Sequence, residues 1–222
     1  MKKSRVLPIA LVAVLATGAI TVENSVSSRI STRVYEVMPR ASDVSASIPL
    51  FDLPENIVTD SIKSIHIEIG EYTLKDSTLN PSLAIDARNI SKSTPNVIGS
   101  LDVTATIPAA TITQLADFND AQIVGNTLQV SVGSAGFGTA ILVPKYQGNQ
   151  IYFELQGVSL FGNEIPADSL PEEIKAQIKS KSERTLNAPK GMRVKSISLS
   201  SQGLALTMQG KNIQPSSIGS TF

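Results

Sequence analysis

Few side chains in this sequence could do chemistry, because it has one histidine and no cysteine. His66 stands between Ile65 and Ile67 in an alternating run, so we expect its side chain on the opposite, polar face of a strand. A zinc site takes several His or Cys ligands, and a Ser-His-Asp triad would depend on His66 alone. No Gly-x-Ser-x-Gly motif accompanies it. We therefore interpret His66 as a surface histidine and assign no catalytic residue.

Three other groups contain residue types that bind ions or phosphates. The Asp-Asn-Asp group at 117–120 lacks the spacing and the distal Glu of a calcium loop, so turn formation accounts for it. The glycines at 133–138 match neither the phosphate-loop nor the dinucleotide spacing. Glu172 and Glu173 are adjacent on a predicted helix, where their side chains diverge by about 100°. The sequence therefore predicts no metal site, no cofactor and no enzymatic activity.

The composition narrows the class of protein further. The chain has 222 residues, 41% of them hydrophobic and 17% charged, which is enough apolar material for a folded core. Lys and Arg total 19, as do Asp and Glu, so no basic field would attract a nucleic acid. The lack of cysteine excludes disulfides, thiolate metal sites and a lipoprotein lipobox. We expect a folded protein without a nucleic-acid partner.

The N-terminus has the pattern of an export signal. Two lysines and an arginine within the first five residues precede an apolar run from Val6 to Val22. As a helix this run would extend about 25 Å, slightly less than a bilayer core, so a cleaved signal peptide and a retained anchor both stay open. We expect residues 1–20 to be that signal peptide or membrane anchor. The rest of the chain should be exported to the periplasmic or cell-envelope side, either secreted or held at the inner membrane by residues 6–22.

Three segments have helical spacing. Apolar residues recur every three or four positions from Val22 to Met38, and this amphipathic helix should end at Pro39. Ser169-Leu170-Pro171-Glu172 has the form of a capping box, which predicts a second amphipathic helix that runs to about Leu186. A short helix is expected from Pro108 to Leu115. The longer two are the helices available to cover a sheet.

From residue 41 the apolar residues recur at every second position, which is typical of strands with one apolar face. We expect strands near 44–48, 65–69, 83–87, 101–107, 128–132, 137–143 and 151–158, a turn at 147–149 and a closing hairpin over 194–208. No linker interrupts them, so we predict a single domain over residues 21–214 and a tail at 215–222. The fold class is α+β, a long curved antiparallel sheet wrapped on one or two helices.

The closing hairpin carries a family resemblance. Ala188–Val194, Ser196–Leu199 and Gly203–Gly210 give a turn with Pro and Gly, an alternating strand, a turn glycine and a last strand that ends in glycine. This order resembles the closing hairpin of the LmeA-like phospholipid-binding family, which comprises cell-envelope proteins of mycobacteria and their relatives.

The resemblance continues upstream and covers about residues 20–214. Pro49–Pro54 is similar to the family's apolar Pro-Phe-Leu segment, although Asp52 interrupts it, and Gly99–Ala110 is similar to its middle strand. The resemblance implies a tubular-lipid-binding-like fold that holds phospholipid in a groove between sheet and helix. It also implies a protein that works at a membrane and supports envelope lipid or lipoglycan assembly, with lipid transfer as a further expectation.

Apolar side chains from the first helix and the first strands would line such a groove. Arg29, Arg33 or Lys63 could meet a headgroup, and solvated surface charge is the simpler interpretation of all three. Core packing is the alternative for the apolar set, since the same area term drives both. The predicted lining is Val26, Ile30, Val34, Leu50, Phe51, Leu53, Ile65, Ile67 and Ile69.

A second function stays open from sequence alone. A membrane-anchored, non-enzymatic interaction or structural protein of the envelope would need no lipid cavity and would offer its sheet edge or loops to a partner. Only the lipid carrier should purify with a stoichiometric phospholipid. No feature of the sequence identifies a protein partner.

Overall fold

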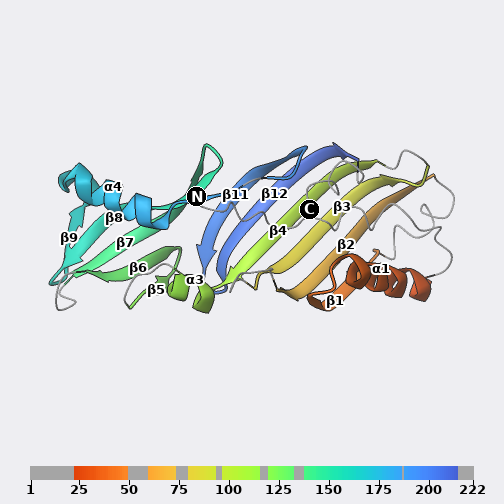
Figure 1. The fold of residues 1–222 in the computed structure, drawn as a ribbon, viewed down its shortest axis with the longest axis horizontal. Coiled ribbons are helices and arrows are strands. Elements are labelled where there is room, and N and C mark those ends of the chain that lie inside the picture. The colour runs from red at the N-terminus through yellow and green to blue at the C-terminus, as the bar shows by residue number, and fades with distance from the viewer. Residues whose placement is uncertain are drawn as a thin grey trace. The chain divides into compact units, whose positions relative to one another are not determined.

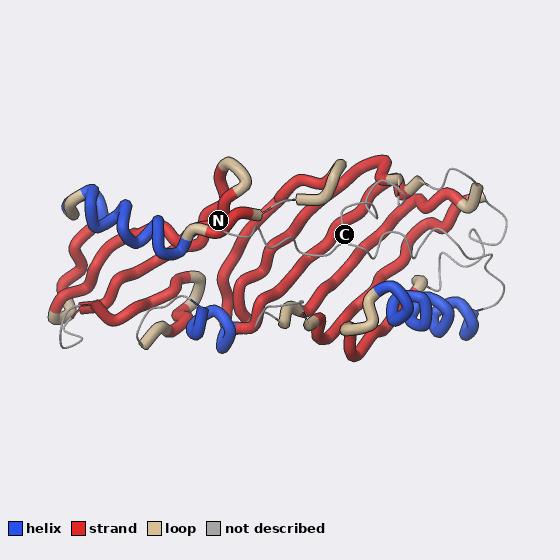
Figure 2. The backbone as a smooth tube through the Cα atoms, in the orientation of Figure 1, coloured by secondary structure: helices blue, strands red, loops and turns tan. Residues whose placement is uncertain are grey.

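The computed structural model describes residues 23–49, 60–73, 80–93, 97–115, 120–132, 138–186 and 188–214 (Figure 1). Strands predominate over short helices in these ranges (Figure 2). The helical elements are α1 (Glu23–Val37), α3 (Ala109–Leu115), the 3-10 helix η3 (Ala167–Ser169) and α4 (Glu172–Ser182). The strands are β1 (Ala41–Ser47), β2 (Ser61–Tyr72), β3 (Ser82–Ser91), β4 (Ile98–Pro108), β5 (Gln122–Val124), β6 (Thr127–Val132), β7 (Gly138–Gln147), β8 (Gln150–Leu160), β9 (Asn163–Pro166), β10 (Arg184–Thr185), β11 (Met192–Ser200) and β12 (Gly203–Ile213).

The strands in the described ranges form two open sheets. One has the order β1-β2-β3-β4-β12-β11, and the other has the order β10-β8-β7-β6-β5 with β9 paired to β8. The described registers are antiparallel, from β1 with β2 through β8 with β9. The predicted α+β class with an antiparallel sheet is therefore confirmed. The division of the strands between two sheets was not visible in the sequence.

The chain divides into two compact units. Unit 1 consists mainly of Thr106–Asn187 and Ser196–Leu206, and unit 2 mainly of Leu7–Ala105, Ala188–Lys195 and Thr207–Phe222. The boundaries between the units fall inside β4, β11 and β12. Compactness does not test whether either unit folds by itself, so the single domain stays a prediction. The expected leader and tail lie outside the described residues.

Unit 1 has its own apolar core. Alternate residues of β6, β7 and β8 point inward, as the period of two predicts, and α3 adds one isoleucine. Burial of each large aliphatic side chain stabilises the fold by about 1.5–3 kcal/mol. The core cluster consists of Ile112, Leu128, Val130, Ala140, Leu142, Phe153, Leu155, Leu199 and Leu204.

Helix α4 packs on β8, and one serine ties the two together. The Ser182 hydroxyl accepts the backbone N–H of Phe153 at 2.9 Å and lies 3.0 Å from the carbonyl of Ile178 within the helix. Strand β10 follows directly and pairs Arg184 with Ile151 of β8. The chain thus passes from helix to strand against the same partner.

The predicted bounds of this helix were wrong at both ends. Pro171 is its N-cap and makes no side-chain cap bond, because the preceding residues form η3, which the Leu170 N–H closes on the Ala167 carbonyl at 3.0 Å. At the other end the chain becomes extended at Glu183 and forms β10, so the helix stops short of Leu186. Tertiary pairing with β8 overrides the helical spacing there.

In unit 2, two glycines accept close cross-strand approaches. Asp43 and Asn89 lie inside strands with φ of 52° and 53°, in the left-handed region that Asn and Asp tolerate best among residues with a side chain. A Cβ on Gly70 would lie 2.9 Å from the Asp43 Cβ, and a Cβ on Gly99 would lie 2.9 Å from the Asn89 Cβ. Only glycine fits at either position without displacing its neighbour.

Candidate lipid-binding face

The predicted lipid-contacting isoleucines of β2 lie on the buried side of the strand. Ile65 and Ile69 are almost fully buried and Ile67 is 0% exposed, whereas His66 and Glu68 between them are more exposed. Side chains alternate along a strand, so the three isoleucines form one row. Each contributes about 1.5–3 kcal/mol when covered, whether protein atoms or acyl chains cover it.

Neighbouring strands continue this row into a face. On β1, Val44 pairs with Ile69 and Ala46 with Ile67, and β3 places buried apolar residues opposite the β2 isoleucines. Strand β4 adds three of its four buried apolar residues, which lie at alternate positions. We call the following set the apolar face of unit 2: Ile65, Ile67, Ile69, Leu83, Ile85, Ala87, Leu101, Val103 and Ala105.

Helix α1 packs against the first strand of this sheet. Val34 is fully buried and Ile30 half-buried, as the amphipathic spacing predicts. The Met38 N–H donates to the Val34 carbonyl at 2.7 Å, and the Val44 N–H donates to the Tyr35 hydroxyl at 3.2 Å. These bonds hold the end of α1 on β1.

The structure therefore brings part of the predicted lining together. Val34 on α1 and the β2 isoleucines belong to unit 2 and are buried. Val26 is in α1, but its side chain is outside the described part of the chain, as are Leu50, Phe51 and Leu53 altogether. Lipid contact at each of these residues stays a prediction.

The basic residues proposed for a headgroup differ in their surroundings. Arg33 forms an exposed ion pair with Glu36 on the next turn of α1. Exposed pairs of this kind stabilise proteins by about 0–1 kcal/mol, so Glu36 would not prevent Arg33 from meeting a phosphate. Arg29 and Lys63 are also exposed.

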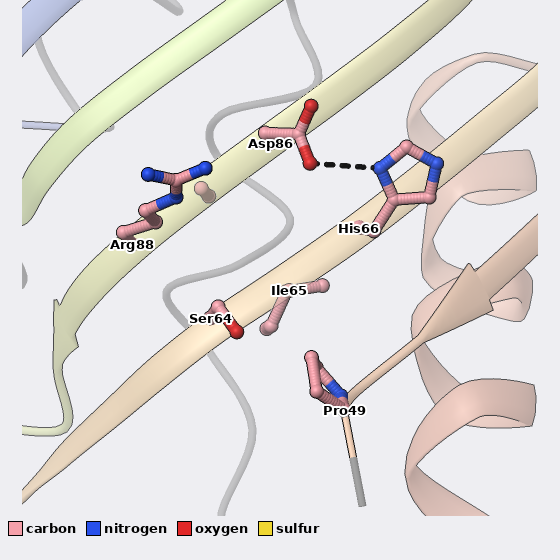
Figure 3. A pocket seen from close by; sticks show the side chains of 7 residues that line it. Pro49, Ser64, Ile65, His66, Asp86 and Arg88 are labelled. Atoms are coloured by element: carbon pink, nitrogen blue, oxygen red, sulfur yellow. Dashed lines mark hydrogen bonds and ion pairs between the residues drawn. The ribbon is translucent and has the colours of Figure 1, made fainter. Parts of the chain in front are cut away.

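On the opposite, polar face of unit 2, His66 contacts two carboxylates. Its Nδ1 lies 2.8 Å from Oδ1 of Asp86 on β3 (Figure 3). Its Nε2 lies 3.2 Å from Oε1 of Glu68. The hydrogen bond to Asp86 raises the pKa of His66 above its ordinary 6.5, and Glu68 acts in the same direction, against the lowering effect of partial burial. The protonated ring is therefore favoured.

A shallow hollow of about 170 Å³ adjoins this histidine. The side chains of Ser64, His66, Asp86 and Arg88 surround it in Figure 3, and β2 pairs Ser64 with Arg88. The sequence indicated the polar face but not these partners, because strand register is invisible in a period-two pattern.

Comparisons with known proteins give one match. No curated protein and no solved structure matches the chain significantly. Of the helices in the described ranges, none has the length and apolar character needed to cross a membrane. A family model described as LmeA-like phospholipid-binding matches residues 14–209, which is most of the chain and agrees with the resemblance in the closing hairpin. The chain belongs to the LmeA-like phospholipid-binding family, and this membership supports the binding of phospholipid.

Proposed function

We propose that the protein is a non-enzymatic phospholipid carrier of the cell envelope, which holds acyl chains against the apolar face of unit 2. Export by the N-terminal segment would deliver it to the envelope, and transfer of the bound lipid would support envelope lipid assembly. Family membership supports the class of ligand. The location of the acyl chains and the transfer role are our inference.

The extent of the apolar face carries this proposal. Of the described helices, α1 makes its main contacts with β1, whereas the buried apolar side chains extend across β2, β3 and β4. A sheet with one apolar face must be covered, and acyl chains supply the same apolar area that a protein core would. Protein atoms already cover these side chains, so an acyl chain laid along the strands would take the place of those atoms.

The position of the candidate lining on adjacent strands supports the same location. Ile67 lies between Ala46 of β1 and Ile85 of β3 in the described registers. An acyl chain that crossed these strands would contact side chains of all three, and each buried methylene group would contribute about 0.8 kcal/mol. A single charge placed at Ile67 should therefore disrupt the contact of the acyl chain with all three strands.

Native mass spectrometry with lipid extraction, on the full chain expressed in a host that exports it, tests the proposal. The wild-type protein should carry about one phospholipid, and Ile67→Glu should lose it because a carboxylate would lie among acyl chains. Ser64→Glu is the matched control: the same charge on the same strand, on the opposite face and opposite Arg88. It should retain the lipid.

A second variant separates lipid loss from unfolding. Ala87→Leu adds apolar volume on the same face, where Ala87 is 1% exposed. Extra volume at so buried a position should lower the free energy of unfolding by about 1–3 kcal/mol while unfolding stays cooperative, and the variant should carry less lipid because the side chain takes space from the acyl chains. A wild-type protein without bound lipid, or equal lipid loss in Ile67→Glu and Ser64→Glu, would overturn the proposed face.

A further inference from the structure

The hairpin between β8 and β9 in unit 1 has an unusual residue at its tip. Leu160 pairs with Asn163, which leaves Phe161 and Gly162 as a two-residue loop. Both have positive φ, 52° for Phe161 and 83° for Gly162. This is the pattern of a type I′ turn, whose first position favours Asn, Asp or Gly.

Phe161 is unfavourable in two respects: a bulky residue rarely adopts its backbone conformation, and its apolar side chain is exposed to water. A bulky side chain at positive φ is strained, yet the Phe161 side chain is 80% exposed, so packing in the core does not explain its presence. The hairpin between β7 and β8 has the same backbone with Gly148 and Asn149, at φ of 56° and 62°. The β7–β8 turn thus has residue types that tolerate positive φ, whereas the β8–β9 turn has a phenylalanine at its first position.

The segment around the tip has no charged side chain. Leu160 beside it is 36% exposed, and residues 155–163 include no charged side chain. The nearest charges on either side are Glu154 and Glu164, both acidic. The tip therefore has nothing in its own sequence to attract an anionic surface, and its contact should depend on apolar area.

We propose that this tip, Leu160 and Phe161, enters the interface of a lipid bilayer and docks the protein on the membrane with which it exchanges lipid. The inference rests on the proposed function and adds a membrane-contact site to it. The small apolar area of the tip favours a bilayer over a protein as its partner. A stable protein interface needs about 800 Å² from each partner, whereas one aromatic side chain buries about 150–250 Å².

A bilayer interface accepts such a small apolar insertion. Aromatic and leucine side chains bury about 5–10 Å deep at the headgroup boundary. The pairing of Leu160 with Asn163 closes the base of the turn, and insertion at the headgroup boundary leaves the backbone groups of Phe161 and Gly162 within reach of water. Docking should occur on neutral lipid and change little with salt.

The chain has no tryptophan, so a single introduced tryptophan reports its own position. Phe161→Trp in the full chain should shift its emission to shorter wavelength with phosphatidylcholine vesicles, and brominated acyl chains should quench it. Val124→Trp is the matched control, since Val124 is 48% exposed at the end of β5. Its emission should not change. Unchanged emission from Phe161→Trp, or equal quenching of both, would overturn the proposal.

Phe161→Asn distinguishes this site from the lipid-binding face. Asn suits the left-handed position, so the variant should melt at the same or a higher temperature. It should keep its bound phospholipid in native mass spectrometry yet transfer it to phosphatidylcholine vesicles about tenfold or more slowly, as expected from the apolar area removed. Transfer at the wild-type rate would contradict docking through this tip. Absence of lipid from the wild-type protein would instead contradict the proposed function.

Discussion

His66 of β2 and Asp86 of β3 are cross-strand partners whose side chains meet at 2.8 Å, His66 through Nδ1 and Asp86 through Oδ1. The ring nitrogen donates and the carboxylate accepts, which favours the imidazolium form. The side chain of His66 remains 37% exposed, so solvent screens the pair and its contribution to stability is modest.

Asp86→Asn should lower the pKa of His66, because the largest cause of its elevation is the hydrogen bond to that carboxylate. A titration of the His66 ring signals by NMR measures this directly, since the chain has a single histidine. Glu68→Gln should lower the pKa by less. An unchanged pKa in Asp86→Asn would show that the pair does not form in solution.

The same interaction predicts how stability depends on pH. The folded-state pKa of His66 is above the unfolded value of 6.5, so its stabilising effect is fully present below about pH 6.5. It is lost as the pH rises through the folded-state pKa. The free energy of unfolding of the wild-type protein, measured between about pH 5.5 and 8, should fall relative to that of His66→Gln. Parallel pH profiles for the two proteins would refute this assignment.

Gly99→Ala should destabilise unit 2 by about 1–3 kcal/mol, because the new Cβ would lie 2.9 Å from the Asn89 Cβ. Denaturant unfolding measures the change. In an Asn89→Gly background the opposing Cβ is absent, so the same substitution should cost less. Equal costs in both backgrounds would mean that the close approach to Asn89 is not the cause.

Ser182→Ala should destabilise unit 1 by about 1–3 kcal/mol, since the Phe153 N–H would lose the hydroxyl that accepts it at 2.9 Å. Thermal unfolding is a suitable measurement. Ser198→Ala, at an exposed position of β11, serves as the control and should have little effect. Similar melting temperatures for both variants would argue against a structural role of the Ser182 bond.

Much of the local structure could be predicted from sequence. The period of two located the buried row of Ile65, Ile67 and Ile69, and the helical spacing located α1 with Val34 inward, because burial follows directly from these periods. The short strands β5, β9 and β10 were missed, since two to four residues cannot establish a period.

Long-range features could not be predicted in this way. The register that sets Asp86 beside His66 depends on how β2 and β3 align, and the strand order depends on which edges meet. The expected capping box failed because the residues before Pro171 form a 3-10 turn instead. The sequence did not single out Phe161, because its positive φ and its exposure are properties of the three-dimensional structure.

The most direct test of the lipid-binding face is photocrosslinking of the full chain with phosphatidylcholine that carries a diazirine on an acyl chain, followed by peptide mass spectrometry. We expect crosslinks in the peptides of β2, β3 and β4 that contain Ile67, Ile85 and Val103, and their loss in Ile67→Glu. Crosslinks that avoid all three strands would contradict it.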